Sequence, residues 1–268
     1  MFLCSQAAGL WYVCSDSMTT SKNQTSRYKN RILASLPKAE ATRLAKQLEP
    51  VTLKQGQSLL DGKATHAYFL EDGMASVVLG LASGDSIEVG VIGKEGAVGL
   101  PILLGTGTIP GRTFMQIAGS GYRIKAEYLK EEFERGGALK DYLLKHMHGL
   151  MVQSAQTAAC NRMHTIEARL ARWLLTCHDR VEADRLLLTH DFLAQMLGSP
   201  RTTVTLAAGA LQEKDLIDYS RGKVMIRDRA GLEKTACECY RAVRDEFRRL
   251  GLLYPRSNGQ PSSKGSPT

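Results

Sequence analysis

The run from Leu188 to Val204 restricts the fold of this chain more than any other segment. Thr189 can cap a helix whose buried side would carry Leu193 and Leu197, four residues apart. Gly198 then offers a turn position that tolerates a positive φ. The pattern predicts two short helices joined by a tight turn, with the second helix crossing the first.

The second helix of this pair carries a polar outer side. We expect Ser199 to be its N-cap and Pro200 its first residue, with Val204 facing inward. Side chains that can hydrogen-bond to bases or phosphates occupy the opposite side, as in helices that enter the major groove of DNA. The predicted DNA contacts of this helix are Ser199, Arg201, Thr202, Thr203, Thr205 and Leu206.

A predicted β-hairpin follows the helix pair. Residues 216–219 and 224–226 are apolar enough for two short strands, and a glycine turn separates them. Arg221 and Lys223 lie at the tip, where they would sit beside phosphates. A basic β-hairpin after such a helix is typical of a winged helix-turn-helix that binds DNA. An ordinary pair of helices in a helical domain needs no such β-hairpin.

The net charge of +8 and the pI near 9.2 suit a polyanionic partner, but the charge is spread along the chain. Residues 162–254 hold sixteen Lys and Arg against thirteen Asp and Glu. Charge therefore supports DNA binding only weakly, and the prediction depends on the helix-turn-helix pattern. The length of 268 residues allows two domains of ordinary size.

Three features predict a cytoplasmic protein. The six cysteines are scattered, as in reduced proteins, and no apolar run approaches the roughly eighteen residues of a membrane helix. The first Lys or Arg is Lys22, which argues against a signal peptide. Residues 1–29 are expected to be disordered, or mis-annotated in part if translation starts at Met18.

The central half of the chain predicts a β domain followed by a long helix. Fourteen of the 25 glycines lie between Gly56 and Gly121, among short alternating apolar runs, as in a small barrel or jelly roll. A short helix is expected over 126–135 and a long one from Ala138 to Asn161. The long helix has a near-heptad seam that packs either within the domain or, as we expect, against a second copy in a homodimer: Leu139, Leu143, His146, Leu150, Gln153 and Thr157. Further helices are expected over 162–187 and 229–250.

This layout resembles that of the Crp–Fnr transcription regulators, over roughly residues 31–235. The resemblance implies an α+β fold and a regulator that acts as a homodimer on double-stranded DNA, with RNA polymerase as a further partner. Arg201 takes the place of an arginine that reads guanine, whereas Thr202 and Leu206 replace two further base-reading residues. The domains expected are a jelly-roll sensor resembling cyclic-nucleotide-binding domains (30–136), a dimerisation helix (137–161), a winged helix-turn-helix (162–250) and a disordered tail (251–268).

The sensor region departs from the family's cyclic-nucleotide cassette. The candidate effector residues are Gly99, Leu100, Arg112 and Thr113, but Leu100 or Pro101 stands where nucleotide binders carry a glutamate for the ribose. A buried ribose hydroxyl without a partner costs roughly 1–3 kcal/mol. We therefore expect no control by cyclic AMP and assign no cofactor. Arg112 would anchor another anion or pair with an acid such as Glu95.

Two metal-dependent sensing sites can also be weighed. Cys4 and Cys14 do not form the close cysteine group of an iron–sulfur sensor. Cys160 and His164 are one helical turn apart, with His146 and His148 nearby in sequence, but such pairs are common by chance. Cys237 and Cys239 would point to different sides of a continuous helix. No metal site is predicted.

The sequence thus predicts a sequence-specific DNA-binding regulator. The alternative is an effector-sensing module, for a small anion, nucleotide, metal or haem, whose DNA binding is weak or vestigial. An enzyme is not predicted, because no nucleophile–base pair, phosphate-cradling loop or paired carboxylates occur at a credible spacing.

Overall fold

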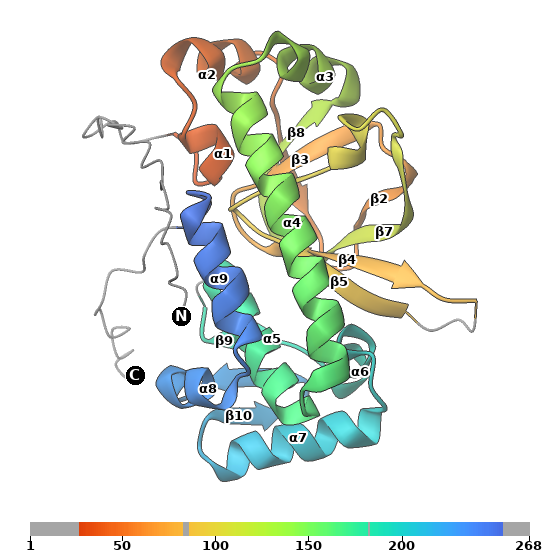
Figure 1. Ribbon diagram of the computed structural model, residues 1–268, viewed down its shortest axis with the longest axis vertical. Helices are drawn as coiled ribbons and strands as arrows, with labels where there is room; N and C mark the ends of the chain where they lie inside the picture. The colour runs from red at the N-terminus through yellow and green to blue at the C-terminus, as the bar shows by residue number, and fades with distance from the viewer. Residues whose placement is uncertain (1–26, 83–85, 182, 254–268) are drawn as a thin grey trace, which may run out of the picture.

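The computed structural model describes residues 27–82, 86–181 and 183–253, and places a β domain above a mainly helical domain along one long helix (Figure 1). The expectations for the first 26 residues, including Cys4 and Cys14, and for the tail after residue 253 lie outside the described residues. Among the described helices, none is both long and apolar enough to cross a bilayer.

The β domain is a jelly roll of two antiparallel four-stranded sheets, as predicted. One sheet has the order β1-β8-β3-β6 and the other β2-β7-β4-β5. The strands are β1 (Glu49–Leu53), β2 (Ser58–Lys63), β3 (His66–Leu70), β4 (Met74–Gly80), β5 (Ser86–Ile92), β6 (Ala97–Val98), β7 (Thr108–Ile117) and β8 (Gly119–Lys125). The sequence did not indicate β2, β6 or β8, because β2 and β8 are largely polar and β6 is two residues long.

Short helices close the upper end of the jelly roll. They are α1 (Arg31–Ala34), α2 (Lys38–Ala45) and α3 (Ala126–Arg135), and a 3₁₀ turn, η1, spans Leu100–Ile102. Asn30 caps α1 by accepting from the backbone N–H of Ile32 at 3.1 Å, and its amide nitrogen donates to the carbonyls of Leu70 and Gly96. The first helix is thereby anchored to the β domain.

The long helix α4 (Ala138–Met163) runs beside the jelly roll. The seam predicted to contact a second copy faces the jelly roll of the same chain and is not available to a dimer partner. Leu139, Leu143, His146, Gln153 and Thr157 are buried within the chain itself, and Leu150 is partly buried. The Gln153 side-chain oxygen accepts from the backbone N–H of Val91 at 2.7 Å, and His146 Nε2 donates to the Ala97 carbonyl at 3.2 Å. The heptad pattern identified a packed side, but its partner is the chain's own β domain.

The described residues of the helical domain form three antiparallel strands and five helices. The strands are β9 (Arg185–Leu187), β10 (Ile217–Ser220) and β11 (Lys223–Ile226), in the order β10-β11-β9. The helices are α5 (Ile166–Val181), α6 (His190–Leu197), α7 (Arg201–Glu213), α8 (Arg229–Thr235) and α9 (Cys239–Arg249). The predicted continuous helix over 229–250 is therefore wrong. Ala236 has an extended backbone with ψ 145°, which separates α8 from α9 and turns α9 alongside α4.

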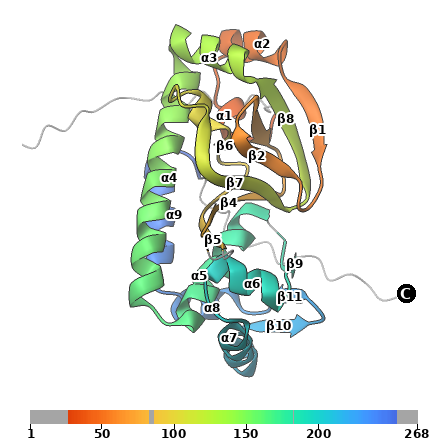
Figure 2. The same cartoon turned by 90° about the vertical axis from the view of Figure 1, so that its right-hand side faces the viewer.

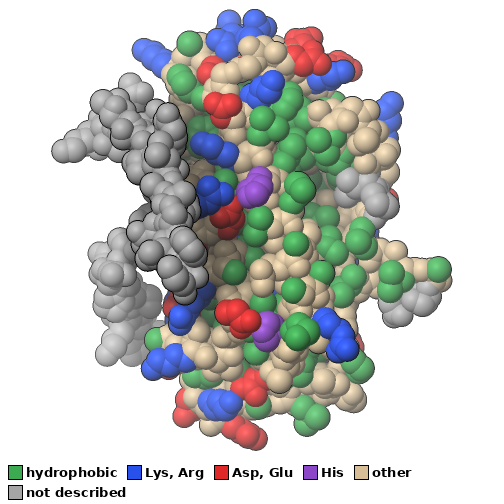
Figure 3. All heavy atoms as spheres, viewed as in Figure 1, with side chains coloured by type: hydrophobic (Ala, Val, Ile, Leu, Met, Phe, Trp, Pro, Cys, Tyr) green, Lys and Arg blue, Asp and Glu red, His purple; other side chains and the backbone are tan. Residues whose placement is uncertain are grey.

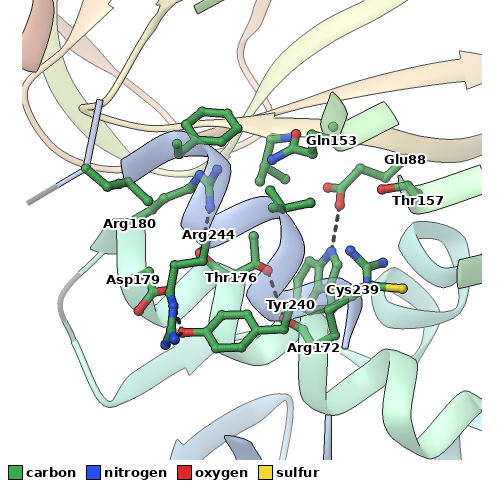
Figure 4. A pocket seen from close by; sticks show the side chains of 16 residues that line it. Glu88, Gln153, Thr157, Arg172, Thr176, Asp179, Arg180, Cys239, Tyr240 and Arg244 are labelled. Atoms are coloured by element: carbon green, nitrogen blue, oxygen red, sulfur yellow. Dashed lines mark hydrogen bonds between the residues drawn. The ribbon is translucent and has the colours of Figure 1, made fainter. Parts of the chain in front are cut away.

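The two domains share one apolar core across β4, β5 and α5. Trp173 of α5 is fully buried with Met74, Val78 and Val91 of the jelly roll, and its indole N–H donates to Glu88 Oε1 at 2.7 Å. Figure 4 shows this contact at a cavity of about 30 Å³, room for about one water molecule, between β5, α4, α5 and α9. Burial raises the pKa of Glu88 to about 7.

A buried ion pair also joins the two domains. Arg180 Nε lies 2.8 Å from Glu95 Oε1, and both side chains are almost completely buried. Glu95 lies between β5 and β6, whereas Arg180 lies in the last turn of α5. The position of the helical domain is therefore fixed by polar contacts as well as by the shared core.

Candidate nucleic-acid interface

The helix-turn-helix has the predicted local geometry at its first helix and its turn. The Thr189 hydroxyl accepts from the backbone N–H of Phe192 at 3.2 Å, which caps α6. Leu193 and Leu197 are buried, and Gly198 has φ 56° and ψ 47° in the left-handed region. A Cβ at Gly198 would lie 2.6 Å from Ile87 Cδ1, so the turn also packs closely on β5.

The start of the second helix differs from the prediction. α7 begins at Arg201, and Pro200 occupies the N-cap position without a side-chain cap. Ser199 is half-buried and its backbone N–H donates to the Ala194 carbonyl at 3.1 Å. Ser199 therefore continues the turn, because the fixed φ of Pro200 with ψ 142° sets the start of the helix one residue later than expected.

The predicted base-reading residues share the outward side of α7. Arg201, Thr202, Thr205 and Leu206 are exposed, Thr203 is half-buried, and Val204 is buried as expected. Leu206 is 76 % exposed, so its methyl groups are accessible to a thymine methyl group in the major groove. Figure 2 shows α7 at the end of the molecule farthest from α2 and α3, where a duplex could approach without meeting the jelly roll.

An acidic neighbour that sequence reasoning missed lies beside Arg201. Arg201 Nη1 lies 3.2 Å from Asp191 Oδ1, and both side chains are mostly exposed. An exposed pair of this kind contributes at most about 1 kcal/mol. It can therefore hold the guanidinium in place without preventing its transfer to a guanine.

His190 connects the helix pair to the hairpin. Its ring stacks on Tyr219 with centroids 4.1 Å apart, and its Nδ1 lies 3.0 Å from the Thr205 hydroxyl. Burial, with a smaller contribution from the charge of Arg201, lowers the pKa of His190. The Tyr219 hydroxyl in turn donates to the Leu188 carbonyl at 3.0 Å. These contacts fix β10 against α6 and α7.

The basic hairpin has the expected form. β10 and β11 are paired antiparallel, with Arg221 and Gly222 in the turn at φ 49° and φ 74°. Positive φ at both central positions is the geometry of a type I′ hairpin turn. Arg221 and Lys223 are exposed, and Arg185 of β9 lines the same surface hollow. Arg185 was not predicted, since its three-residue strand has no periodic signal.

Three of the four candidate effector residues lie in the interior of the jelly roll, and the fourth, Arg112, lies on its surface. Gly99, Leu100 and Thr113 are buried in the jelly roll, and η1 contacts β7. Arg112 is exposed and lies over the Phe114 ring, 4.9 Å from its centroid. The proposed Arg112–Glu95 pair is wrong, because Glu95 is buried and pairs with Arg180.

Comparison with known proteins agrees with this geometry. Residues 168–235 match the Crp-like helix-turn-helix domain family. The chain is 24% identical over 174 residues to a global nitrogen regulator of Nostoc, covering 61% of this chain and 77% of that protein.

Solved structures share the fold at low sequence identity. A putative Crp/Fnr-family regulator from Eubacterium rectale aligns with TM-score 0.61 and 20% identity over 75% of this chain and 94% of that one. The c-di-GMP-responsive regulator CLP of Xanthomonas campestris aligns with TM-score 0.57 and 15% identity over 71% and 99%. Residues 168–235 thus match a Crp-like helix-turn-helix domain, and the chain as a whole shares the fold of the solved Crp/Fnr-family structures.

Proposed function

We propose that this regulator reads a specific DNA sequence as a homodimer and does so without cyclic AMP. The observation that carries the proposal is the outward side of α7, where Arg201, Thr202, Thr205 and Leu206 are exposed toward an approaching duplex. Arg201 is assigned to a guanine, since its planar fork matches the O6 and N7 acceptors. We assign Arg221 and Lys223 to the phosphates that flank the bases. Ser199 and Thr203 are assigned to support the turn of the helix pair where it lies beside the DNA backbone.

An exposed apolar stripe on α4 supports the homodimer. Leu144 and Met151 are seven residues apart and are 45 % and 71 % exposed, and the exposed Ala158 continues the same spacing. Figure 3 shows hydrophobic side chains along the face of the molecule on which α4 lies. A heptad of exposed apolar residues suits a second copy of the same helix. This stripe replaces the buried seam as the proposed dimer contact.

The dimer proposal has a direct test. Met151→Glu places a charge in the stripe and should convert dimer to monomer in analytical ultracentrifugation. Leu81→Glu is the matched control, because Leu81 is also exposed, at 59 %, but belongs to the loop after β4. Equal dimerisation of both variants would contradict the proposed contact.

The independence from cyclic AMP is supported by the jelly roll. Leu100, where nucleotide binders carry an acid, is only 7 % exposed, and it packs among apolar neighbours. A ribose hydroxyl would find no acceptor from that side chain. Arg112 lies on the surface over Phe114, so it is available to an anion from solvent.

Selection of bound fragments from random double-stranded DNA, without added nucleotide, tests the proposed function. We expect a palindrome whose half-sites lie about 34 Å apart, one helical turn, as for other dimeric helix-turn-helix proteins. Enrichment that occurs only when cyclic AMP is added would contradict the proposed independence. Weak binding with no enriched sequence, with or without nucleotides and extract, would favour the sensing module with vestigial DNA binding.

A further inference from the structure

Three cysteines and a histidine converge at the corner between α4, α8 and α9. Cys160 lies in the last turn of α4 and His164 is its C-cap residue, whereas Cys237 precedes α9 and Cys239 begins it. One ligand atom from each of the four lies within 4.8 Å of all the others. The three thiols are buried, and the imidazole is half-buried.

We propose that Cys160, His164, Cys237 and Cys239 bind one Zn²⁺ ion as a Cys₃His site. Soft thiolate and imidazole ligands in a set of four are typical of structural zinc, which needs no open coordination position. The site joins two segments more than seventy residues apart in sequence. It lies outside the helix-turn-helix, and the proposal does not depend on DNA binding.

The distances between the ligand atoms fit a tetrahedron around zinc. Cys160 Sγ lies 3.5 Å from Cys237 Sγ, and Cys239 Sγ lies 3.5 Å from His164 Nδ1. With Zn–S near 2.3 Å and Zn–N near 2.0–2.1 Å, a tetrahedral site has S···S edges of about 3.8 Å and S···N edges of about 3.5 Å. These two distances differ from the tetrahedral ones by a few tenths of an ångström or less, and the other distances between the four atoms, all within 4.8 Å, need to shorten by at most about 1 Å.

The surrounding hydrogen bonds orient two of the ligands. His164 Nε2 donates to Glu238 Oε1 at 3.1 Å, which leaves the Nδ1 lone pair directed at the thiols. This is the carboxylate–histidine arrangement found around zinc sites. Gln156 Nε2 donates to Cys239 Sγ at 3.1 Å, as amides often do to a metal-bound thiolate. A purely apolar cysteine cluster would need neither contact.

The charge around the cluster favours thiolates. Arg172 is buried, and its Nε donates to no acceptor among the described residues. Arg172 lines the same small cavity as Cys239, so its charge lies beside the cluster. Three thiolates and Zn²⁺ together carry one negative charge, and a buried arginine beside them compensates it.

The break after α8 creates the site. In one continuous helix Cys237 and Cys239 would diverge, whereas the extended residue Ala236 lets both thiols face the end of α4. A bound ion would tie α9 to the corner between α4 and α5, from which the helix-turn-helix domain continues. Metal loading would thereby stabilise the position of that domain.

The experiment is metal analysis of the full-length protein, purified under reducing conditions without chelator, by native mass spectrometry and elemental analysis. We expect one zinc per chain. Exchange for Co²⁺ should give thiolate-to-metal charge transfer and the intense d–d bands of tetrahedral cobalt. Cys239→Ser and His164→Gln should weaken binding strongly, and Cys177→Ala should leave it unchanged because Cys177 is buried in α5 away from the cluster.

Loss of zinc binding in the ligand variants could reflect misfolding, so a variant outside the four ligands provides a second test. Glu238→Gln changes an exposed side chain and should lower zinc affinity by about 10- to 100-fold in competition with a chromophoric chelator, with an unchanged circular dichroism spectrum. A reduced protein that binds no zinc when zinc is added would overturn the proposal. So would a native Cys160–Cys237 disulfide, or zinc retained at equal affinity in Cys239→Ser and His164→Gln.

Discussion

The helix-turn-helix and the jelly roll of this chain differ in how far their candidate binding residues are exposed to solvent. On α7 the residues able to contact a ligand are exposed and are supported from behind by buried Val204. In the jelly roll, Gly99, Leu100 and Thr113 are buried, and only Arg112 of the candidate effector residues reaches solvent. The helix of the proposed DNA contact thus presents its candidate residues to solvent, whereas the candidate effector positions mostly belong to the packed interior of the jelly roll.

The contacts that join the two regions give the largest expected effect. Glu95→Gln should destabilise the protein by about 3–5 kcal/mol, because it leaves the Arg180 charge buried without its partner. Urea denaturation measures this loss. Glu49→Gln is the matched control: Glu49 also lies 2.8 Å from an arginine, Arg123, but that pair is exposed and should contribute less than about 1 kcal/mol. Similar losses in both variants would mean that the Glu95 pair does not link the two regions.

Glu88 should make the stability of this junction depend on pH. Its folded pKa of about 7 lies above the ordinary 4.5, so its contribution is full below about pH 4.5 and is lost as the pH rises through 7. Burial lowers the pKa of His146 to about 4, so that contribution is instead lost as the pH falls below about 6.5. The two effects oppose each other in the wild-type protein.

Glu88→Gln should therefore separate the two effects. The variant keeps only the His146 contribution, so its stability should rise more steeply with pH than that of the wild type. From below pH 4.5 to above pH 7 the stability of the variant relative to the wild type should increase by about 3 kcal/mol. Urea denaturation at pH 5 and pH 8 measures most of this change, and a constant difference would show that Glu88 ionises normally.

A smaller effect is expected at the cap of α6. Thr189→Ala removes the hydroxyl that accepts from Phe192 and should cost about 1 kcal/mol of stability. DNA affinity should fall only slightly, because Leu193, Leu197 and the turn still fix α7. The exposed Thr202→Ala offers a comparison in the same motif, since it should change DNA affinity more than thermal stability. The reverse pattern would contradict the separate roles given to the two threonines.

The sequence predicted best where the controlling interactions are local. Thr189, Gly198 and Val204 are within sixteen residues of each other, and their roles follow from capping, positive φ and helical periodicity. The periodicity of α4 correctly indicated a packed side, but periodicity does not reveal which surface covers it. His146 contacts β6 and Gln153 contacts β5.

The features that depend on how separate elements are placed in space were beyond sequence reasoning. The Asp191–Arg201 pair and the Arg185 side chain near the hairpin depend on tertiary placement. The same holds for the convergence of Cys160 with Cys237, which needs a helix break at Ala236 that no Gly or Pro announces. An unbroken apolar pattern over 229–250 favoured a single helix, and packing against α4 and α5 decided otherwise.

The most direct test of the central claim is the affinity of Arg201→Ala for the selected operator and for operators changed at each guanine, without cyclic AMP. We predict a loss of about 1–3 kcal/mol on the selected site and no further loss when one particular guanine is replaced. Arg112→Ala, which changes an exposed arginine of the jelly roll, should bind both DNAs as the wild type does. Uniform weakening of Arg201→Ala on every sequence would make Arg201 a phosphate contact and would contradict the account.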